Sequence, residues 1–475
     1  MKINYITAKT ISTKLKEYLF KLLVRALFID WFRKSVLWLL ALHFKNNSSK
    51  INVQRKLLYS AILDTVNRLI AKRTISIEIA GKVASLWIKA LRTPPHKIPA
   101  VAKFHSKNNV DPPWFLTISP GHSCNLKCEG CYAASSLGGN KLEWPILERI
   151  INEAKALWGV RLVVFSGGEP LLYSSHNKGV LDIVERNPDL LFLLFTNGTL
   201  INEKLSTRLS KLGNLTPAFS VEGMQNRTDD RRGKGIFNLI KQKMKLLRQV
   251  GVPFGISVTV MRDNYEEVLA DEFLDLFFGE LGAFYAFYFQ YLPIGHQPNL
   301  ESMPTPLQRL DFWRRVWNII EEKRLFLVDF WNHGPLVNGC ISAGRAGGYL
   351  YIDWNGNIMP CVFAPYAATN IHQVYGNGGT LNDVWALPIF QAIRNWQINY
   401  GFGKQKLSTE GNWMSSCPFR DHYPMFRSWI DQYELEPEDE SARLVMLDRH
   451  YSQNMTEYAR KFRKLSQKIW NREYL

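Results

Sequence analysis

Three of the six cysteines lie within eight positions, in the run CNLKCEGCY that holds Cys124, Cys128 and Cys131. Three thiolates this close together can surround one metal centre, but they are one ligand short of a closed zinc site or a fully cysteine-ligated cluster. On a [4Fe-4S] cube, three ligands leave one iron open to a small molecule. The spacing therefore predicts an iron–sulfur site that activates a bound molecule. A structural zinc site completed by a distant His or Cys is the alternative.

Further polar motifs each follow an apolar, strand-like run. They are residues 166–170 (SGGEP), 196–199 (TNGT), 219–223 (FSVEG) and, a little downstream, 231–235 (RRGKG). Paired glycines expose backbone groups and allow a ligand to approach closely. The Glu169 carboxylate can accept hydrogen bonds from an ammonium group, and the basic stretch 231–235 suits a carboxylate. Because the carboxyl ends of parallel strands gather at one edge, these motifs are expected to meet the cysteines there.

The motifs, taken in order over residues 114–295, resemble those of radical S-adenosylmethionine (radical SAM) enzymes. The resemblance implies a [4Fe-4S] cluster whose open iron chelates S-adenosylmethionine. An electron from a low-potential donor of the ferredoxin or flavodoxin type would release methionine and a 5′-deoxyadenosyl radical, which abstracts hydrogen from an unactivated C–H bond. No residue is assigned to the control of the substrate radical. The implied site residues are Cys124, Cys128 and Cys131 for the cluster, and Gly167, Gly168, Glu169, Asn197, Ser220 and Arg232 for S-adenosylmethionine.

The chain departs from the family pattern in two places. Many members have an aromatic residue just before the third cysteine, whereas this chain has Gly130 there and Tyr132 just after it. Glu222 stands where a related subgroup has Asp. Neither position is a cluster ligand, so the expected cluster site is unaffected.

The C-terminal third holds the other three cysteines: Cys340, Cys361 and Cys417. The first two flank residues 351–360, where Asn-Gly between apolar residues predicts a β-hairpin. This arrangement resembles the opening of a SPASM extension, which usually has seven cysteines and two auxiliary clusters. Three cysteines imply either one auxiliary [4Fe-4S] cluster or a domain without metal. The fourth ligand of such a cluster would be the substrate or a residue other than cysteine, for which Asp421 and His422 are the candidates.

The elements that must position these residues alternate between strands and helices. Six such repeats indicate an α/β fold of parallel strands with right-handed crossovers, fewer than the eight of a closed barrel, so we expect a partial (β/α)6 barrel. The expected domains are 1–110, 111–300 for the barrel and 301–475 for a SPASM-like α+β region with C-terminal helices. The expected strands cover residues 114–119, 161–165, 191–195, 216–221, 254–260 and 284–291, and the helices 147–158, 203–212, 237–250 and 265–278.

The N-terminal segment carries the basic excess. The chain has 475 residues, 46% of them hydrophobic, and a net charge of +17; residues 1–110 hold 21 Lys and Arg against four acidic residues, which accounts for all of it. Residues 14–44 and 55–91 predict basic amphipathic helices. These helices either pack on the catalytic body or lie on an anionic membrane surface. Nucleic-acid binding is the weaker alternative, because no nucleic-acid module is recognisable, and none is expected as a partner.

Cysteine content and hydropathy indicate where the protein acts. Sparse cysteines indicate a reducing compartment, so the expected localisation is cytoplasmic or peripheral on the inner face of the membrane. The longest uncharged apolar run, 36–42, is too short to span a bilayer, and no cleavage site of a signal peptide follows. The favoured function is hydrogen abstraction from a membrane-lipid chain. The alternatives are a peptide- or protein-modifying maturase and, from another class, a non-catalytic iron–sulfur electron carrier.

Overall fold

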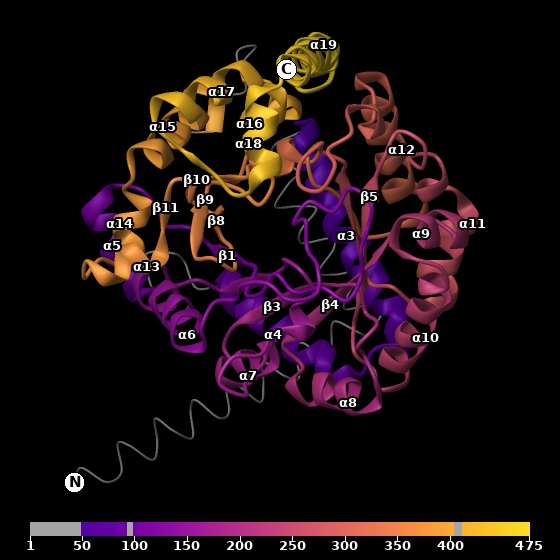
Figure 1. Ribbon diagram of the computed structural model, residues 1–475. Coiled ribbons are helices and arrows are strands. Elements are labelled where there is room, and N and C mark those ends of the chain that lie inside the picture. The colour runs from indigo at the N-terminus through magenta and orange to yellow at the C-terminus, as the bar shows by residue number, and fades with distance from the viewer. Residues whose placement is uncertain (1–48, 93–97, 403–410) are drawn as a thin grey trace, which may run out of the picture.

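The computed structural model describes residues 49–92, 98–402 and 411–475 (Figure 1). The helix expected over 14–44 and the 93–97 part of the expected linker lie outside them. A central sheet contains six consecutive parallel strands, each neighbour paired with the next. These strands are β1 (Phe115–Ile118), β2 (Leu162–Phe165), β3 (Leu191–Thr196), β4 (Leu215–Val221), β5 (Gly255–Val260) and β6 (Ala286–Gln290).

The prediction of a partial parallel barrel is confirmed, with strand ends shifted by one or two residues. One short strand that the sequence did not suggest, β7 (Leu327–Asp329), extends the barrel in parallel beside β6. At the other side, β8 (Tyr349–Ile352) pairs in parallel with β1. The predicted hairpin is also present, since β8 pairs antiparallel with β9 (Asn357–Met359). Gly356, in the turn, has a φ of +82°, a conformation that favours glycine.

Helices cover the outer face of the sheet (Figure 1). Their apolar stripes are buried on the strands, as with Ile150, Leu209 and Ile240. The helix expected over 265–278 is interrupted at Ala270, whose backbone is extended. The main covering helices are α6 (Trp144–Glu153), α7 (Val180–Arg186), α8 (Glu203–Leu212), α9 (Gln225–Arg232), α10 (Ile236–Gln249) and α11 (Asp271–Leu274), which η5 (Asp275–Leu281) continues.

The strands read as nearly continuous apolar runs because both of their faces are covered. Alternate residues point outward to the helices and inward to the barrel interior. On β2, for example, Val163 and Phe165 are buried in the large outer core, whereas Leu162 and Val164 belong to an inner cluster with Leu193. The inward set is what lines the candidate site.

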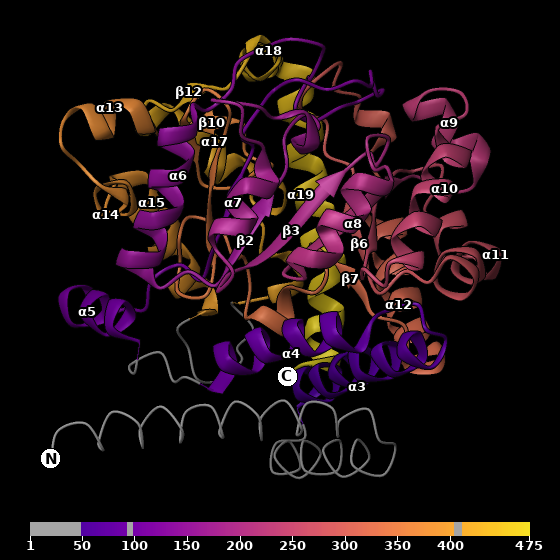
Figure 2. The same cartoon turned by 90° about the horizontal axis from the view of Figure 1, so that it is seen from below.

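The N-terminal helices close one end of the barrel. Helices α3 (Lys50–Ala71) and α4 (Ile77–Arg92) run across the end that lies opposite the carboxyl termini of the strands (Figure 2). The Thr65 hydroxyl donates to the Arg324 carbonyl, and the Tyr474 hydroxyl donates to the side-chain oxygen of Gln54. Among the described helices, none is both long enough and apolar enough to cross a membrane.

The C-terminal region packs against the open side of the barrel, between β7 and β8. Helix α12 (Pro306–Lys323) contacts both α3 and α19 (Arg449–Glu473), so the two ends of the described chain meet there. The remaining helices are α5 (Pro99–Asn108), α13 (Ile371–Gly376), α14 (Leu381–Trp385), α15 (Pro388–Gln397), α16 (Pro418–Asp421), α17 (Tyr423–Gln432) and α18 (Glu440–Leu447).

Candidate active site

A cavity of about 520 Å³ runs from the three-cysteine loop through the barrel interior to helix α3. The end at the carboxyl termini of the strands is called the upper end, and the end at α3 the lower end. The cysteines and the strand-end motifs meet at the upper end, as expected from the parallel topology. Aromatic and aliphatic side chains from the strands line the middle. Of the residues expected from sequence to hold the first cluster and S-adenosylmethionine, all but Glu169 contribute to the wall: Cys124, Cys128, Cys131, Gly167, Gly168, Asn197, Ser220 and Arg232.

The three cysteines form part of one wall, in the loop that follows β1. None of them is in a disulfide, and burial raises the pKa of Cys124 to about 11 and also raises that of Cys128. Two donors approach the sulfurs: Asn197 Nδ2 lies 3.8 Å from Cys124 Sγ, and Arg232 Nη1 lies 3.8 Å from Cys128 Sγ. The described side chains contain no group of three His, Cys, Asp or Glu close enough to hold a single metal ion.

The Gly167–Gly168 turn packs directly against the segment that leads into the cysteines. A Cβ on Gly168 would lie 2.3 Å from the Ser123 carbonyl oxygen, and Gly167 has a φ of +111°. The Gly168 amide donates to the Gly121 carbonyl, and the Glu169 amide donates to the Ser123 carbonyl. Only glycine fits this close approach, and it leaves the backbone bare where it faces the cavity.

The Glu169 carboxylate lies behind the cavity wall. It accepts hydrogen bonds from Thr196 Oγ1 at 2.7 Å, the Asn197 amide at 2.8 Å and the Leu171 amide at 3.0 Å. Burial raises the pKa of Glu169, although these hydrogen bonds oppose the shift. In this structure the side chain therefore holds the ends of β2 and β3 together, with no contact to the cavity.

The two arginines of the basic stretch 231–235 are anchored by a buried carboxylate. Arg231 and Arg232 end helix α9, and both pair with the Glu222 carboxylate, which is 2% exposed. Arg231 also donates to the backbone carbonyls of Glu129 and Gly130. This buried cluster, the Glu222–arginine clamp, ties the end of β4 to the loop that carries the cysteines.

The residues of the clamp keep one another in their charged forms. Burial alone would raise the pKa of Glu222, but Arg232 and Arg231 outweigh it and hold the pKa below its usual range. Glu222 in turn raises the pKa of Arg232 against the effect of burial. Arg232 thus stays cationic beside Cys128 and presents its positive charge to the cavity wall.

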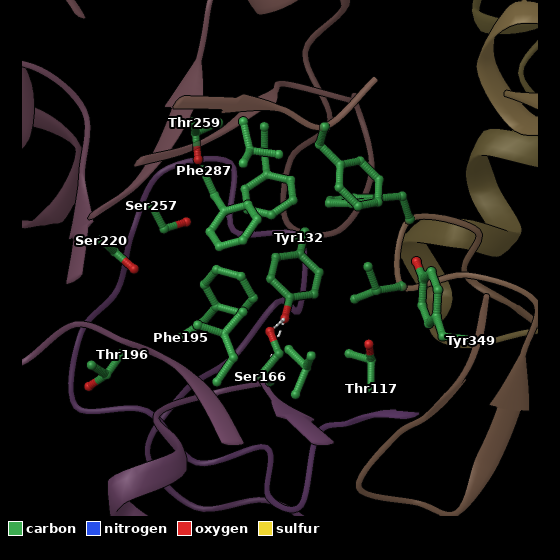
Figure 3. A pocket seen from close by; sticks show the side chains of 18 of the residues that line it. Thr117, Tyr132, Ser166, Phe195, Thr196, Ser220, Ser257, Thr259, Phe287 and Tyr349 are labelled. Carbon is green, nitrogen blue, oxygen red and sulfur yellow. Dashed lines mark hydrogen bonds between the residues drawn. The ribbon is translucent and has the colours of Figure 1, made fainter. Parts of the chain in front are cut away.

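Tyr132 also belongs to the site, although in the sequence it stands out only as a difference from the usual family pattern. Its hydroxyl lies 2.6 Å from Ser166 Oγ and accepts a hydrogen bond from the Gly167 amide at 3.0 Å (Figure 3). Burial raises its pKa to about 12, so the phenol is neutral. Gly130 explains the missing aromatic residue: it has a φ of +59°, and a Cβ there would lie 3.0 Å from the ring of Tyr291.

The middle of the cavity is mostly apolar, with hydroxyls on one side. The rings of Phe195, Phe287 and Phe289 contact one another, with centroids 5.5–6.0 Å apart. Across from Tyr132, the hydroxyls of residues on β3, β4 and β5 point inward, as Figure 3 shows. The hydroxyl-bearing residues are Thr196, Ser220, Ser257 and Thr259.

A second, smaller pocket brings together the cysteines of the C-terminal third. Cys340, Cys361 and Cys417, the second cysteine trio, all line it. Tyr349 lines both this pocket and the main cavity, and its hydroxyl lies 3.0 Å from Cys361 Sγ. No sequence pattern indicates this contact, because Tyr349 lies twelve residues before Cys361, on β8.

The two candidate fourth ligands are engaged elsewhere. The buried Asp421 carboxylate pairs with Arg309 at 2.5 and 3.0 Å, and His422 Nε2 lies 2.9 Å from the Ser415 carbonyl. Neither residue lines the second pocket. In this structure neither side chain is therefore placed to act as a fourth ligand in that pocket.

The residues at the upper end fit an iron–sulfur cluster with a small polar ligand. Three sulfur donors open on one space, and cationic Arg232 and the Asn197 amide group face them, as suits negatively charged thiolates. Beside them the Gly167–Gly168 backbone and Ser220 offer hydrogen-bonding groups to a ligand. A [4Fe-4S] cube holds its cysteine sulfurs further apart than a single metal ion does, so the lack of a single-ion site among the described residues does not conflict with a cluster.

Comparison with known proteins gives the family. The model of the radical SAM superfamily matches residues 118–274. The AdoMet-dependent heme synthase of Methanosarcina barkeri is 26% identical over 289 residues, which are 55% of this chain and 78% of that protein. The sporulation killing factor maturation protein SkfB of Bacillus subtilis is 31% identical, over 33% of this chain and 38% of that one.

Structural comparison agrees at the level of the fold. Streptococcus suis SuiB, in a crystal structure with its precursor peptide SuiA, superposes with a TM-score of 0.50 and 21% identity. The match covers 62% of this chain and 70% of SuiB. The ordered motifs, the partial barrel and the family match lead to one conclusion: residues 118–274 of this chain form a domain of the radical SAM superfamily, whose enzymes use a [4Fe-4S] cluster and S-adenosylmethionine.

Proposed function

We propose that this enzyme abstracts hydrogen from an unactivated C–H bond of an apolar, lipid-type chain held inside the barrel. The observation that carries the proposal is the cavity, which is continuous from the cysteine loop to α3 and lined along its middle by apolar side chains. When bound, the cluster and S-adenosylmethionine supply the 5′-deoxyadenosyl radical.

The upper end of the cavity is assigned to the cofactors. Cys124, Cys128 and Cys131 hold the cluster, and Arg232 and Asn197 stabilise the thiolate charge through the two contacts of 3.8 Å. The Gly167–Gly168 backbone and Ser220 bind the polar end of S-adenosylmethionine. Glu169 acts indirectly, because it holds in place the strand ends that carry these groups.

The barrel interior is assigned to the substrate. Phe195, Phe287 and Phe289 give an apolar chain a surface that excludes water, which protects a radical from side reactions. Burial of each CH₂ group against such a wall contributes about 0.8 kcal/mol, so a long chain binds well without any polar contact.

A membrane surface is the proposed source of this substrate. The supporting facts are the net charge of +17 concentrated in residues 1–110, the residues of α3 that line the lower end of the cavity, and the position of α3 and α4 at one end of the barrel (Figure 2). Each basic residue near an anionic leaflet contributes about 1 kcal/mol. The electron donor is proposed to be a small low-potential protein of the ferredoxin or flavodoxin type.

Peptide modification is the second candidate. Two observations favour it: a relative named for the maturation of a sporulation killing factor, and the pocket that gathers the second cysteine trio. That pocket is proposed to hold one auxiliary cluster, with the rest of residues 301–475 as a SPASM-like region. The relative named as a heme synthase adds tetrapyrroles as a third class to test.

Isotope transfer distinguishes these substrates. Reconstituted full-length enzyme is incubated with S-adenosylmethionine, reductant and deuterated cell extract that has been separated into lipid, peptide and tetrapyrrole fractions. Deuterium in 5′-deoxyadenosine from the lipid fraction alone supports the proposal, whereas transfer from the peptide fraction alone selects the maturase function and transfer from the tetrapyrrole fraction the third class.

The control removes the cluster ligands. Substituting Cys124→Ala, Cys128→Ala and Cys131→Ala together should abolish 5′-deoxyadenosine formation with every fraction. Formation of 5′-deoxyadenosine by this triple variant would contradict the assignment of these cysteines and favour electron transfer or another role for the loop.

A further inference from the structure

The lower end of the cavity contains hydrogen-bond donors to which an apolar chain could not bind. Leu58 and Tyr59 of α3 line it together with Leu336 and Val337 of η7 (Gly334–Val337). Two groups that can donate hydrogen bonds, Arg55 and His333, line the same end. Neither takes part in the proposed cofactor chemistry at the upper end.

Arg55 is a half-buried cation held only by neutral groups. Its Nε and Nη2 donate to the Leu336 carbonyl at 3.0 and 2.9 Å, and Nη2 also donates to Asn338 Oδ1 at 2.8 Å. Nη1 has a single long contact, 3.5 Å to Asn52 Oδ1. No carboxylate among the described residues forms an ion pair with it. The guanidinium is therefore fixed in place with no carboxylate partner in the described part of the chain, and its Nη1 has only the long contact to Asn52.

His333, which precedes the short helix η7, supplies a second donor. The ring is 5% exposed, and burial lowers its pKa to about 3, so the imidazole is neutral at physiological pH. Nδ1 accepts the Asp329 amide hydrogen at 3.3 Å, which places the ring proton on Nε2. Nε2 is buried and has no hydrogen-bond partner among the described residues. A buried, unpaired donor is costly unless a ligand accepts from it.

The same end opens to the surface. Tyr59 and Val337 both line the cavity, yet they are 46% and 45% exposed. Val53, on the same helix, is 48% exposed and adds to an apolar rim. Half-exposed residues of both α3 and η7 thus line the cavity, which places its opening between these two elements.

We propose that the substrate carries an anionic headgroup, a carboxylate or a phosphate, which Arg55 and His333 hold at the lower mouth while its apolar body extends through the barrel toward the cysteine loop. This inference rests on the proposed function and adds to it the charge and the orientation of the substrate. The cation provides selectivity for the headgroup, and the aromatic interior provides selectivity for the chain.

Equilibrium binding to the full-length protein tests the headgroup. The probes share one alkyl chain and end in a phosphate, a carboxylate, an alcohol or a trimethylammonium group. We expect the two anionic probes to bind at least tenfold more tightly than the alcohol, and the ammonium probe to bind most weakly; the better of the two anions identifies the headgroup class. Equal affinity for the alcohol and both anions would overturn the inference.

Matched arginine variants locate the effect. Arg55→Gln should remove the preference for anions and leave alcohol binding within about twofold, whereas Arg55→Lys should retain part of the preference. Arg68→Gln is the control, because Arg68 is on the same helix and its pKa is also lowered by burial, but it does not line the cavity. A preference that survives Arg55→Gln, or that Arg68→Gln removes equally, would overturn the inference.

Photolabelling tests the orientation without any variant. An alkyl phosphate with a diazirine beside the phosphate should label peptides from 50–71 or 330–340. The same chain with the diazirine at its far end should label 191–198 or 286–290. The reverse pattern would overturn the inference but leave the proposed function standing, whereas no saturable binding of any of these chains would remove both.

Discussion

The buried Glu222–arginine clamp should control the order of the cysteine loop. Glu222→Gln keeps the shape of the side chain but removes the charge that compensates Arg231 and Arg232. The carboxylate is 2% exposed and each guanidinium 11%, so the variant would leave two poorly solvated cations side by side. Breaking a buried ion pair from one side costs about 3–5 kcal/mol.

This cost should appear as local opening. Arg231 holds the carbonyls of Glu129 and Gly130, and Arg232 faces Cys128, so loss of the clamp frees the loop between two cluster ligands. Since about 1.4 kcal/mol is a factor of ten, the opening equilibrium should rise by roughly two to three orders of magnitude. Amide hydrogen exchange of peptides covering 121–136 and 222–236 measures it, and the iron retained after reconstitution should fall.

An exposed ion pair provides the control. Glu301 pairs with Arg262 but is 81% exposed, so Glu301→Gln should change neither exchange nor iron content. Unchanged exchange in the Glu222→Gln loop peptides would refute the reasoning. So would an increase of the same size in the control variant, because it would show that burial of the pair is not what matters.

The clamp also predicts an acid response with a definite sign. The folded-state pKa of Glu222 is lowered, so its contribution to stability is complete above the ordinary carboxyl pKa of about 4.3 and is lost as the pH falls through the lower folded value. Wild-type loop peptides should therefore exchange faster, after correction for intrinsic rates, below about pH 4. The Glu222→Gln variant should lack that acid-induced rise in exchange. A rise of equal size in both proteins would show that protonation of Glu222 is not its cause.

Four further outcomes are expected. The triple variant of the loop cysteines should retain about four iron atoms per chain if the second cysteine trio holds a cluster, and background iron if the trio is structural. Gly130→Ala should destabilise the loop by about 1–2 kcal/mol, because its φ of +59° strains any side chain, and should lower the iron content; normal iron would contradict this. Leu193→Trp, which fills the cavity, should weaken chain binding while S-adenosylmethionine is still cleaved; unchanged chain binding would place the substrate elsewhere. Sedimentation with vesicles should show the full chain bound to anionic but not neutral lipid, with partial release by salt; equal binding to both, or none, would favour the helices as packing elements.

The sequence by itself determined the barrel and the upper end of the site. Strands buried on both faces read as apolar runs, and parallel strands place their carboxyl ends at one edge whatever the details of packing. The motifs after β1 to β4 therefore had to converge, and of the residues expected to hold the first cluster and S-adenosylmethionine only Glu169 lies off the cavity wall. The short strand β7 was missed because three residues carry too little periodic signal.

Tertiary structure alone decided what these groups contact. Nothing in the run RRGKG shows that Glu222 neutralises its arginines, since that depends on how α9 packs beside β4. Nothing near Cys361 indicates that the Tyr349 hydroxyl lies 3.0 Å away. The lower mouth of the cavity is the extreme case: Arg55 and Leu336 are 281 residues apart. Local patterns specify strands and helices, but the charge and shape of a cavity depend on packing between distant elements, which no local pattern encodes.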